Sequence, residues 1–159
     1  MAAHGDLKTR AVDGERLPVV EFAFPGALRD ELVAAILRGD KTSTTGLLVD
    51  FEREGETVPR VGERFAVIDS DLRAVAVIET TEVRVVPCGE VDEAFARDEG
   101  EGFETVAAWR AAHERFWGGY IEELRAYLGD PDWQVTDATL VVAERFRLVR
   151  VLEPPVRDP

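Results

Sequence analysis

A single lysine followed by four hydroxyl residues is the most reactive pattern in this sequence. Lys41 precedes Thr42, Ser43, Thr44 and Thr45, and it is the only lysine after residue 8 in a chain that otherwise uses arginine. A lysine, unlike an arginine, can lose its proton when it is desolvated, and beside a hydroxyl it can form a nucleophile–base pair. The simpler interpretation is a hydroxyl-rich strand edge with a solvated lysine, and residue types alone favour it.

Glu99 is the carboxylate that the helical spacing singles out. Val91, Phe95 and Glu99 are four residues apart, so they share one stripe of a short helix expected from about Glu90 to Asp98. Burial and the negative end of a helix both disfavour an ionised carboxyl group. The side chain would therefore take up a proton, find a cation such as Lys41, or escape by fraying of the last turn. A solvated helix end is an equally weighted alternative.

Four other side chains are weaker candidates for lining a pocket. Glu79 and Glu144 each fall on the apolar face of a strand if the register is unbroken, although a bulge that turns the charge outwards is the commoner explanation. Trp109 and His113 share a helical stripe, and such residues more often pack a helix than contact a substrate. We keep Glu79, Trp109 and His113 as candidate substrate-binding residues.

Several kinds of site and location are disfavoured by the sequence. Two histidines and one cysteine give no metal-ligand spacing, so no metal or other cofactor is expected. Gly39–Thr42 resembles the end of a phosphate-binding loop, but it follows a helix and lacks the glycine-rich turn. The lone Cys88 makes no internal disulfide, which favours a cytoplasmic location. No apolar run approaches the roughly 18 residues of a membrane span, so no membrane partner is expected.

The charge of the chain limits its partners. With 19 basic and 32 acidic side chains the formal net charge is −13. Such an acidic protein is not expected to present an extended surface that tracks a phosphate backbone. A nucleoside or a short RNA in a local pocket remains compatible with this charge. The sequence does not decide whether the chain forms a homodimer.

The elements that must position these residues follow from periodicity. The 159 residues, 45% of them hydrophobic, suit one domain with a packed core. We expect a flexible leader at residues 1–16, one domain over residues 17–150 and a tail at residues 151–159. Helices are predicted at Ala27–Arg38, about Glu90–Asp98, Thr105–Trp117 and Tyr120–Leu128, strands at Arg64–Asp69, Arg73–Val86 and about Thr139–Val149, and a charged loop at about Asp50–Gly62. This order predicts an α+β fold with a small sheet or barrel.

The segment Arg73–Val86 carries the strongest strand signal. Its alternating pattern predicts one face in an unbroken register, made of Val75, Val77, Thr81, Val83 and Val85. Glu79 falls on that same face.

The order of these segments resembles the ASCH domain, a member of the PUA-like superfamily. Two motifs carry the resemblance: a G-x-K-x-x-T pattern at Gly39, Lys41 and Thr44, and the sequence E-G-E-G from Glu99. The matching stretches are Asp30–Thr45, Val58–Asp69, Ala76–Val86, Val91–Gly102, Trp109–Phe116 and Ala143–Val149. Together they span nearly all of the chain from Phe22 to Val149.

The resemblance implies a small PUA-like β-barrel flanked by helices, with a cleft that accepts nucleosides or RNA. Compact bacterial relatives are amidohydrolases that remove the acetyl group from acetylcytidine, and their catalytic residues fall here on Lys41, Thr44 and Glu99. In that mechanism Lys41 would take the proton of Thr44, and Glu99 would orient Lys41 or pass a proton to the leaving amine. The substrate would also contact the neighbouring hydroxyls of Thr42, Ser43 and Thr45.

Two other functions occur among relatives of this family. Many are described only as RNA-binding proteins, and a few have been assigned ribonuclease activity. The Trp109–Asp130 helices also make this chain longer than the compact amidohydrolases. We therefore predict an amidohydrolase acting on a modified cytidine nucleoside, with a non-catalytic RNA-binding module as the alternative and a ribonuclease as a less favoured one.

Overall fold

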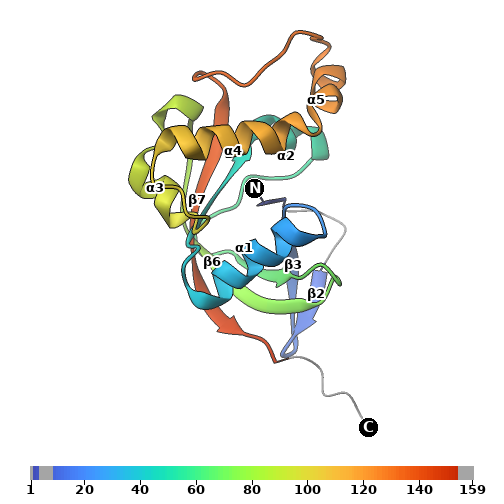
Figure 1. The fold of residues 1–159 in the computed structure, drawn as a ribbon. Coiled ribbons are helices and arrows are strands. Elements are labelled where there is room, and N and C mark those ends of the chain that lie inside the picture. The colour runs from blue at the N-terminus through green and yellow to red at the C-terminus, as the bar shows by residue number, and fades with distance from the viewer. Residues whose placement is uncertain (1, 4–8, 154–159) are drawn as a thin grey trace.

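The computed structural model describes residues 2–3 and 9–153, which form one mixed sheet and a set of helices (Figure 1). The strands are β1 (Ala2–Ala3), β2 (Thr9–Val12), β3 (Glu15–Phe22), β4 (Ser43–Leu47), β5 (Arg64–Ile68), β6 (Ala74–Pro87) and β7 (Leu140–Val151). The helices are α1 (Ala27–Arg38), α2 (Leu48–Glu54), the 3₁₀-helix η1 (Cys88–Glu90), α3 (Glu93–Asp98), α4 (Val106–Gly118) and α5 (Ile121–Leu128).

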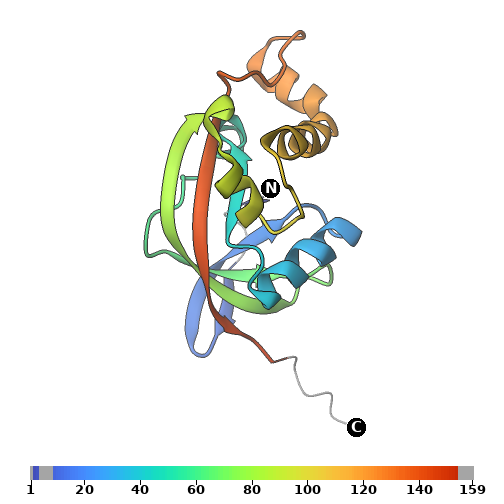
Figure 2. The same ribbon diagram turned by 60° about the vertical axis from the view of Figure 1, so that its left-hand side comes forward.

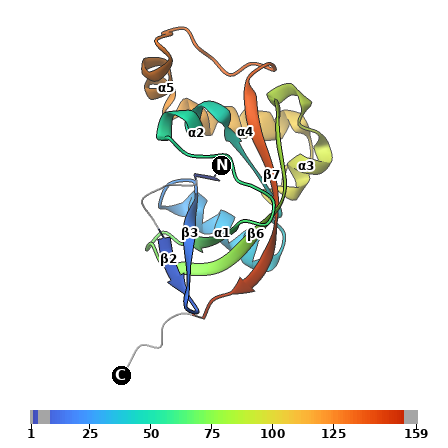
Figure 3. The ribbon, with the colours of Figure 1, turned by 180° about the vertical axis from the view of Figure 1, so that it is seen from behind.

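The sheet is strongly curved but open. Its strand order is β1-β3-β5-β6-β7-β4, and β2 pairs with β3 outside this path. The β3–β5 pair is parallel, and the other pairs are antiparallel. Within the described residues no ladder joins β4 back to β1, so the sheet curls without closing (Figure 3). The predicted α+β class is confirmed, and "barrel" describes the shape of the sheet rather than a closed ring of hydrogen bonds.

The helices and the sheet enclose two main apolar clusters. Figure 2 shows the long β6 and β7 strands on one side and α1, α3 and α4 on the other. One cluster packs α1 against β3, β5, β6 and β7. It contains Leu32 and Ile36 of the helix and Phe22 and Phe146 of the sheet. The other packs α3, α4 and α5 against β4 and β7, and Trp109 and Trp117 are its largest buried side chains.

The N-terminal segment differs from the expected flexible leader at residues 9–16. There β2 and the start of β3 form a hairpin, whose turn uses positive φ angles at Asp13 and Gly14. Val12 and Leu17 are buried by this hairpin, which gives it an apolar reason to be ordered. The rest of the expected leader, residues 1 and 4–8, and most of the expected tail, residues 154–159, lie outside the described residues. Residues 151–153 continue from β7.

The predicted unbroken register of β6 is wrong. Register shifts between Val77 and Ile78 and between Thr80 and Glu82 interrupt its pairing with β7. As a result Ile78 and Thr80 are buried, whereas Val85 is 46% exposed. A strand of 14 residues that contributes to both ends of a curled sheet needs such irregularities to bend.

The predicted helices agree with the structure within a few residues, and the helix Ala27–Arg38 is confirmed at both ends. The short helix α2, in contrast, lies at the start of a segment expected to be a loop.

None of the helices in the described part of the chain is both long and apolar enough to cross a lipid bilayer.

Arg29 anchors the start of α1 to the sheet. Its guanidinium is 1% exposed and donates to the carbonyl oxygens of Phe22 at 3.1 Å and Ala23 at 2.7 Å. It also pairs with Glu21 at 3.2 Å. A buried cation needs all of these acceptors, so Arg29 fixes the position of the first turn of α1 relative to β3. The position of Lys41, which follows the last turn of the same helix, depends on this anchor.

We expect Arg29→Ala to lower the free energy of unfolding by about 3–5 kcal/mol, because it removes one partner of a buried charged network. The matched control is Arg38→Ala on the same helix. Arg38 is 60% exposed and pairs with the equally exposed Asp40, so its loss should cost about 1 kcal/mol or less. Urea unfolding of both variants measures the difference, and equal costs would contradict the anchoring role.

Candidate functional site

Lys41 is buried between α1 and β4 and held by main-chain oxygens. The residue is 1% exposed. Its Nζ donates to the carbonyl oxygen of Ser43 at 2.9 Å and to that of Glu99 at 3.1 Å. The ammonium also lies 5.7 Å from the centre of the Phe22 ring. These contacts offset part of the cost of removing a charge from water.

Main-chain contacts bring the two sequence motifs together. The amide of Thr42 donates to the carbonyl of Asp98 at 2.7 Å, and the hydroxyl of Ser43 donates to the carbonyl of Phe95 at 3.0 Å. The last turn of α3 is thereby fixed to the segment that leads into β4. Gly100 follows at a φ of 72°, and a Cβ atom there would lie 2.7 Å from both the N and the Cα of Lys41. Only glycine allows this close approach.

The carboxylate of Glu99 is completely buried and has two side-chain partners. The hydroxyl of Thr45 donates to its Oε1 at 2.7 Å, and Nε2 of His113 lies 3.0 Å from its Oε2. Nδ1 of His113 lies 2.9 Å from the carbonyl oxygen of Trp109. Since a carbonyl oxygen can only accept, Nδ1 carries a proton. The contact between Nε2 and Oε2 therefore needs a second, shared proton.

The electrostatics favour the ionised form of Glu99. Burial by itself would raise the pKa of this carboxyl group, but the positive charges of His113 and Lys41 outweigh it and hold the pKa well below its usual range. Of the three outcomes that the sequence left open for Glu99, the structure supports the pairing with a cation. The direct partner of the carboxylate is His113, however, and Lys41 reaches only the main chain.

Aromatic rings surround the Glu99–His113 pair. The imidazole stacks on Trp109 at 4.4 Å between ring centres and meets the edge of Trp117 at 5.3 Å. The ring of Phe103 lies 6.0 Å away. Such apolar walls exclude water, and a low-dielectric surrounding strengthens the ion pair inside it.

A third group, the carboxyl of Glu101, lies close to the Glu99–His113 pair. One donor atom from each of Glu99, Glu101 and His113 lies within 4.8 Å of the others. Burial raises the pKa of Glu101, with a further contribution from the charge of Glu99. These three residues are the ones that could hold a metal ion in the described part of the chain.

Thr44 lies on the other face of β4 from this cluster. Side chains alternate along a strand, so Ser43 and Thr45 share one face while Thr44 and Gly46 share the other. Across the β4–β7 ladder Thr44 is opposite Glu144. Glu144 is 5% exposed, and burial raises its pKa to about 8, against a smaller lowering by Lys41. Glu144 therefore carries a proton at neutral pH.

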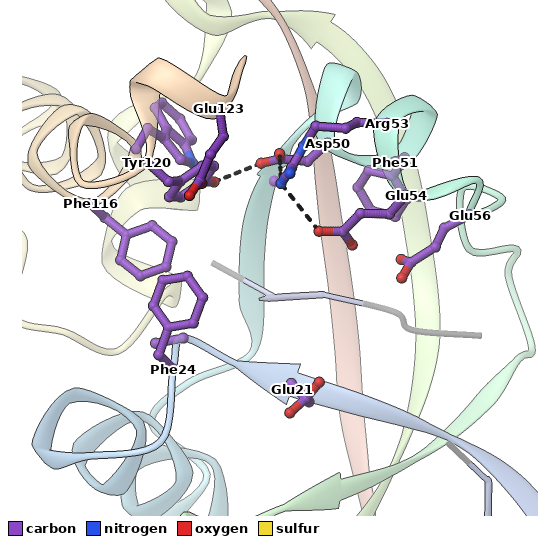
Figure 4. A pocket seen from close by; sticks show the side chains of 13 residues that line it. Glu21, Phe24, Asp50, Phe51, Arg53, Glu54, Glu56, Phe116, Tyr120 and Glu123 are labelled. Atoms are coloured by element: carbon purple, nitrogen blue, oxygen red, sulfur yellow. Dashed lines mark hydrogen bonds and ion pairs between the residues drawn. The ribbon is translucent and has the colours of Figure 1, made fainter. Parts of the chain in front are cut away.

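A pocket of about 350 Å³ opens on this second face of β4. Figure 4 shows the rings of Phe24 and Phe116 stacked at its side, 5.6 Å apart, and the hydroxyl of Tyr120 donating to Asp50 at 2.6 Å. Five carboxylates and one arginine line it: Glu21, Asp50, Glu54, Glu56, Glu123 and Arg53. The pocket also reaches Gly46 and Trp117, so it shares walls with β4 and with the aromatic surround of His113.

The structure thus gathers most of the predicted site residues. Buried contacts join Lys41, Ser43, Thr45, Glu99, Trp109 and His113. Thr42 is half-buried next to them, with its hydroxyl 3.5 Å from the Asp98 carbonyl. Glu79 lies elsewhere: the β6 irregularity leaves it paired with Arg64 and Arg147 at 2.9 and 3.2 Å, and these arginines lower its pKa.

Some residues of the site were missed or underrated from the sequence. In the sequence, Glu101 stands out only as a member of the E-G-E-G motif. Its position two residues after Glu99 could have indicated a second carboxylate at the site. Glu144 was a weak candidate that the structure buries opposite Thr44. Asp50 and Tyr120, which are 70 positions apart, carry no sequence signal of their contact.

Comparisons with known proteins agree with the fold. The family model described as the ASCH domain matches residues 20–150. The chain is similar to an ASCH domain from Lactobacillus crispatus JV V101, with 30% identity, a TM-score of 0.69, and coverage of 81% of this chain and 77% of that one. A search of curated proteins found no match.

Two further solved structures are similar. Protein EF3133 from Enterococcus faecalis V583 is 29% identical, with a TM-score of 0.69, over 82% of this chain and 75% of that one. The hypothetical protein PH0355 is 14% identical with a TM-score of 0.50, over 76% of this chain and 93% of that one. The second likeness concerns the fold alone.

We expect Gly100→Ala to destabilise the fold by about 3 kcal/mol or more, because its Cβ would collide with the main chain of Lys41 at an unfavourable φ. The matched control is Gly102→Ala. Gly102 has a φ of 82°, but no atom lies within 4 Å of the position that a Cβ would take, so only the backbone cost of about 1–2 kcal/mol applies. Equal losses in chemical unfolding would show that the close approach does not matter.

The raised pKa of Glu144 makes stability depend on pH. Its pKa is higher in the folded state than its ordinary value of 4.5, so the folded state binds the extra proton and stability falls as pH rises towards 8. Relative to wild type, Glu144→Gln should gain about 3 kcal/mol in free energy of unfolding between pH 5 and pH 8. Unfolding across this range, with the exposed Glu90→Gln as control, tests the sign; a parallel wild-type and Glu144→Gln profile would contradict it.

Proposed function

The chain belongs to the ASCH domain family, whose members have a PUA-like fold and generally bind RNA, and from this premise we propose that it hydrolyses the acetyl amide of an acetylated cytidine nucleoside. The reaction consumes water and yields cytidine and acetate. The residues in question are Lys41 and Thr44, with Glu99 in support.

The observation that carries the proposal is the burial of Lys41. A lysine ammonium inside a small domain costs stability unless several acceptors compensate it, and such groups concentrate at functional sites. Here two carbonyl oxygens hold Nζ, and its charge acts on the carboxyl groups of Glu99, Glu101 and Glu144. A structural lysine would be better placed at the surface.

The neighbouring pocket supports a nucleoside of this kind as the substrate. The pocket reaches β4 at Gly46, whereas Lys41, Thr44 and Glu144 do not line it. Its volume of about 350 Å³ is at the lower end of the roughly 300–1,000 Å³ typical of small-molecule sites. Phe24, Phe116 and Tyr120 offer ring faces and edges for a base to contact. The five carboxylates around these rings disfavour a phosphate group, so an uncharged nucleoside fits better than a nucleotide or a long RNA.

In the proposed mechanism Thr44 is the nucleophile. Its Oγ1 forms a bond to the acetyl carbon as its proton passes to Nζ of Lys41. The ammonium of the resting site therefore first has to release one proton to solvent and turn from the Ser43 and Glu99 carbonyls towards Thr44. The C–N bond to the base then breaks, and the exocyclic amine leaves with a proton. We assign the supply of that proton to Glu144, because it is opposite Thr44 and its raised pKa favours the protonated form at neutral pH. Water then hydrolyses the acetyl ester on Thr44, which releases acetate and restores the hydroxyl.

Glu99 acts in this scheme through position. Its main-chain carbonyl fixes Nζ of Lys41, while its carboxylate is occupied by Thr45 and His113. Of the two roles that the sequence left open for Glu99, we therefore assign it the orienting one, and we assign the proton-donor role to Glu144.

A second candidate function is binding without catalysis. The observation that favours it is the depth of the residues, since Lys41 is 1% and Thr44 is 2% exposed. A buried nucleophile needs the substrate to enter between β4 and its neighbours. A protein that only holds a modified base in the aromatic pocket would not need that access.

The test is the release of cytidine from N4-acetylcytidine, followed by chromatography. Wild type should turn over, and Thr44→Val, which keeps the shape but removes the hydroxyl, should lower kcat by about 10²–10⁴-fold. Thr81→Val is the matched control, since Thr81 is an exposed threonine of β6 outside the site, and it should change kcat by less than about threefold.

Melting temperatures of the three proteins separate catalysis from folding. If wild type shows no turnover yet binds the nucleoside, the non-catalytic function holds. Turnover that survives Thr44→Val unchanged would refute the assigned nucleophile.

A further inference from the structure

We propose that Glu99, Glu101 and His113 form a binding site for one divalent transition-metal ion, with Zn²⁺ and Mn²⁺ as its closest fits. The inference is independent of the proposed hydrolysis and holds whether or not the chain is an enzyme. It rests on the geometry of the three side chains, on their support by a second set of contacts, and on an access route from the solvent.

The donor atoms lie close to the separation that one ion requires. Zn²⁺ binds imidazole nitrogen and carboxylate oxygen at about 2.0–2.2 Å in a tetrahedral arrangement, so two such ligands lie about 3.4 Å apart. Nε2 of His113 and Oε2 of Glu99 are separated by 3.0 Å. One donor atom of Glu101 completes a set of three that all lie within 4.8 Å of one another.

These atoms lack other hydrogen bonds of ordinary geometry. Within the described residues, Oε2 of Glu99, Oε2 of Glu101 and Nε2 of His113 are buried without a well-oriented hydrogen-bond partner. Glu99 and His113 are 0% exposed, so solvent does not satisfy them directly. In this part of the chain, Oε2 of Glu99 and Nε2 of His113 face only each other, at 3.0 Å, and Oε2 of Glu101 has no such partner. A shared ligand would satisfy all three atoms together.

The contacts behind the ligands hold them in a metal-binding orientation. Nδ1 of His113 donates to the carbonyl of Trp109 at 2.9 Å, which directs Nε2 towards Glu99. Histidines that bind metals usually make this kind of bond through their other ring nitrogen. The hydroxyl of Thr45 fixes the second oxygen of Glu99 at 2.7 Å in the same way.

A surface hollow between α1 and α4 gives access to the site. Glu101 and Phe103 line it from the α3–α4 connection, and Asp30 and Glu31 line it from α1. The carboxylates that line the hollow attract a cation. Their negative charge offsets part of the repulsion that the positive charges of Lys41 and Arg38 exert on it. Glu101 is half-buried, so it lines the hollow and also has a donor atom close to Glu99 and His113.

The charged groups that face the Glu99–His113 pair are Lys41, before β4, and Glu101, on the α3–α4 connection.

Calorimetric titration of the full, EDTA-treated chain with ZnCl₂ and separately with MnCl₂ tests the proposal. Wild type should bind one ion per chain. Glu101→Gln should weaken binding about tenfold or more, and Glu31→Gln, which removes a carboxylate from the same hollow but no ligand, should change it less than about threefold.

His113→Gln is the second ligand variant, and it should weaken binding at least as much as Glu101→Gln. Circular dichroism checks that this buried substitution keeps the fold, and the half-buried Glu101 keeps the test decisive if it does not. Absence of binding up to about 1 mM metal would overturn the proposal, as would an affinity that Glu101→Gln leaves at the wild-type value.

Discussion

The ammonium of Lys41, enclosed between two main-chain carbonyls, is the contact on which the rest of the structure depends. Its bonds to Ser43 and Glu99 connect the start of β4 to the end of α3. Around it the fold must supply a helix that ends at Gly39, a turn that leaves no room for a side chain at Gly100, and acidic groups that balance the charge. The position of α1, set by Arg29, is part of the same requirement.

The charge of Lys41 divides the nearby carboxyl groups into two kinds. Glu99, with His113 as a second cation, stays ionised, whereas Glu144 on the other side of β4 is dominated by burial and holds a proton. Groups whose pKa values are pushed apart in this way can act as base and acid at one pH. The strand β4 separates them, so one face of it points to a closed polar cluster and the other to an open aromatic pocket.

Local patterns in the sequence predicted much of this arrangement. The apolar stripe of α1 and the glycine after it predicted both ends of the helix. The stripe of Val91, Phe95 and Glu99 indicated a buried carboxylate as one of two equally weighted alternatives, and the structure buries Glu99. The resemblance to the ASCH domain correctly indicated the family and the α+β fold. The helix ends and the helical stripe depend on residues that are close together in the sequence. The family and the fold class follow from common ancestry with other ASCH domains.

The features that the sequence did not predict depend on distant packing. Alternation along β6 could not reveal its two register shifts, because these follow from the curvature of the whole sheet. The partner of Glu99 was found in His113, whose helical spacing with Trp109 indicated only a packed face. The acidic lining of the pocket likewise comes from β3, α2 and the α4–α5 region, which no short pattern links.

The most direct test of the central claim, that Lys41 belongs to a ligand site, is the NMR signal of its side chain. The chain has only two lysines, Lys8 and Lys41, so ¹⁵N-lysine labelling gives two Nζ resonances, which Lys8→Arg assigns. In the Thr44→Val protein, N4-acetylcytidine should shift the Lys41 resonance in a saturable way and leave that of Lys8 in place. A Lys41 resonance that does not move at any nucleoside concentration would contradict the account.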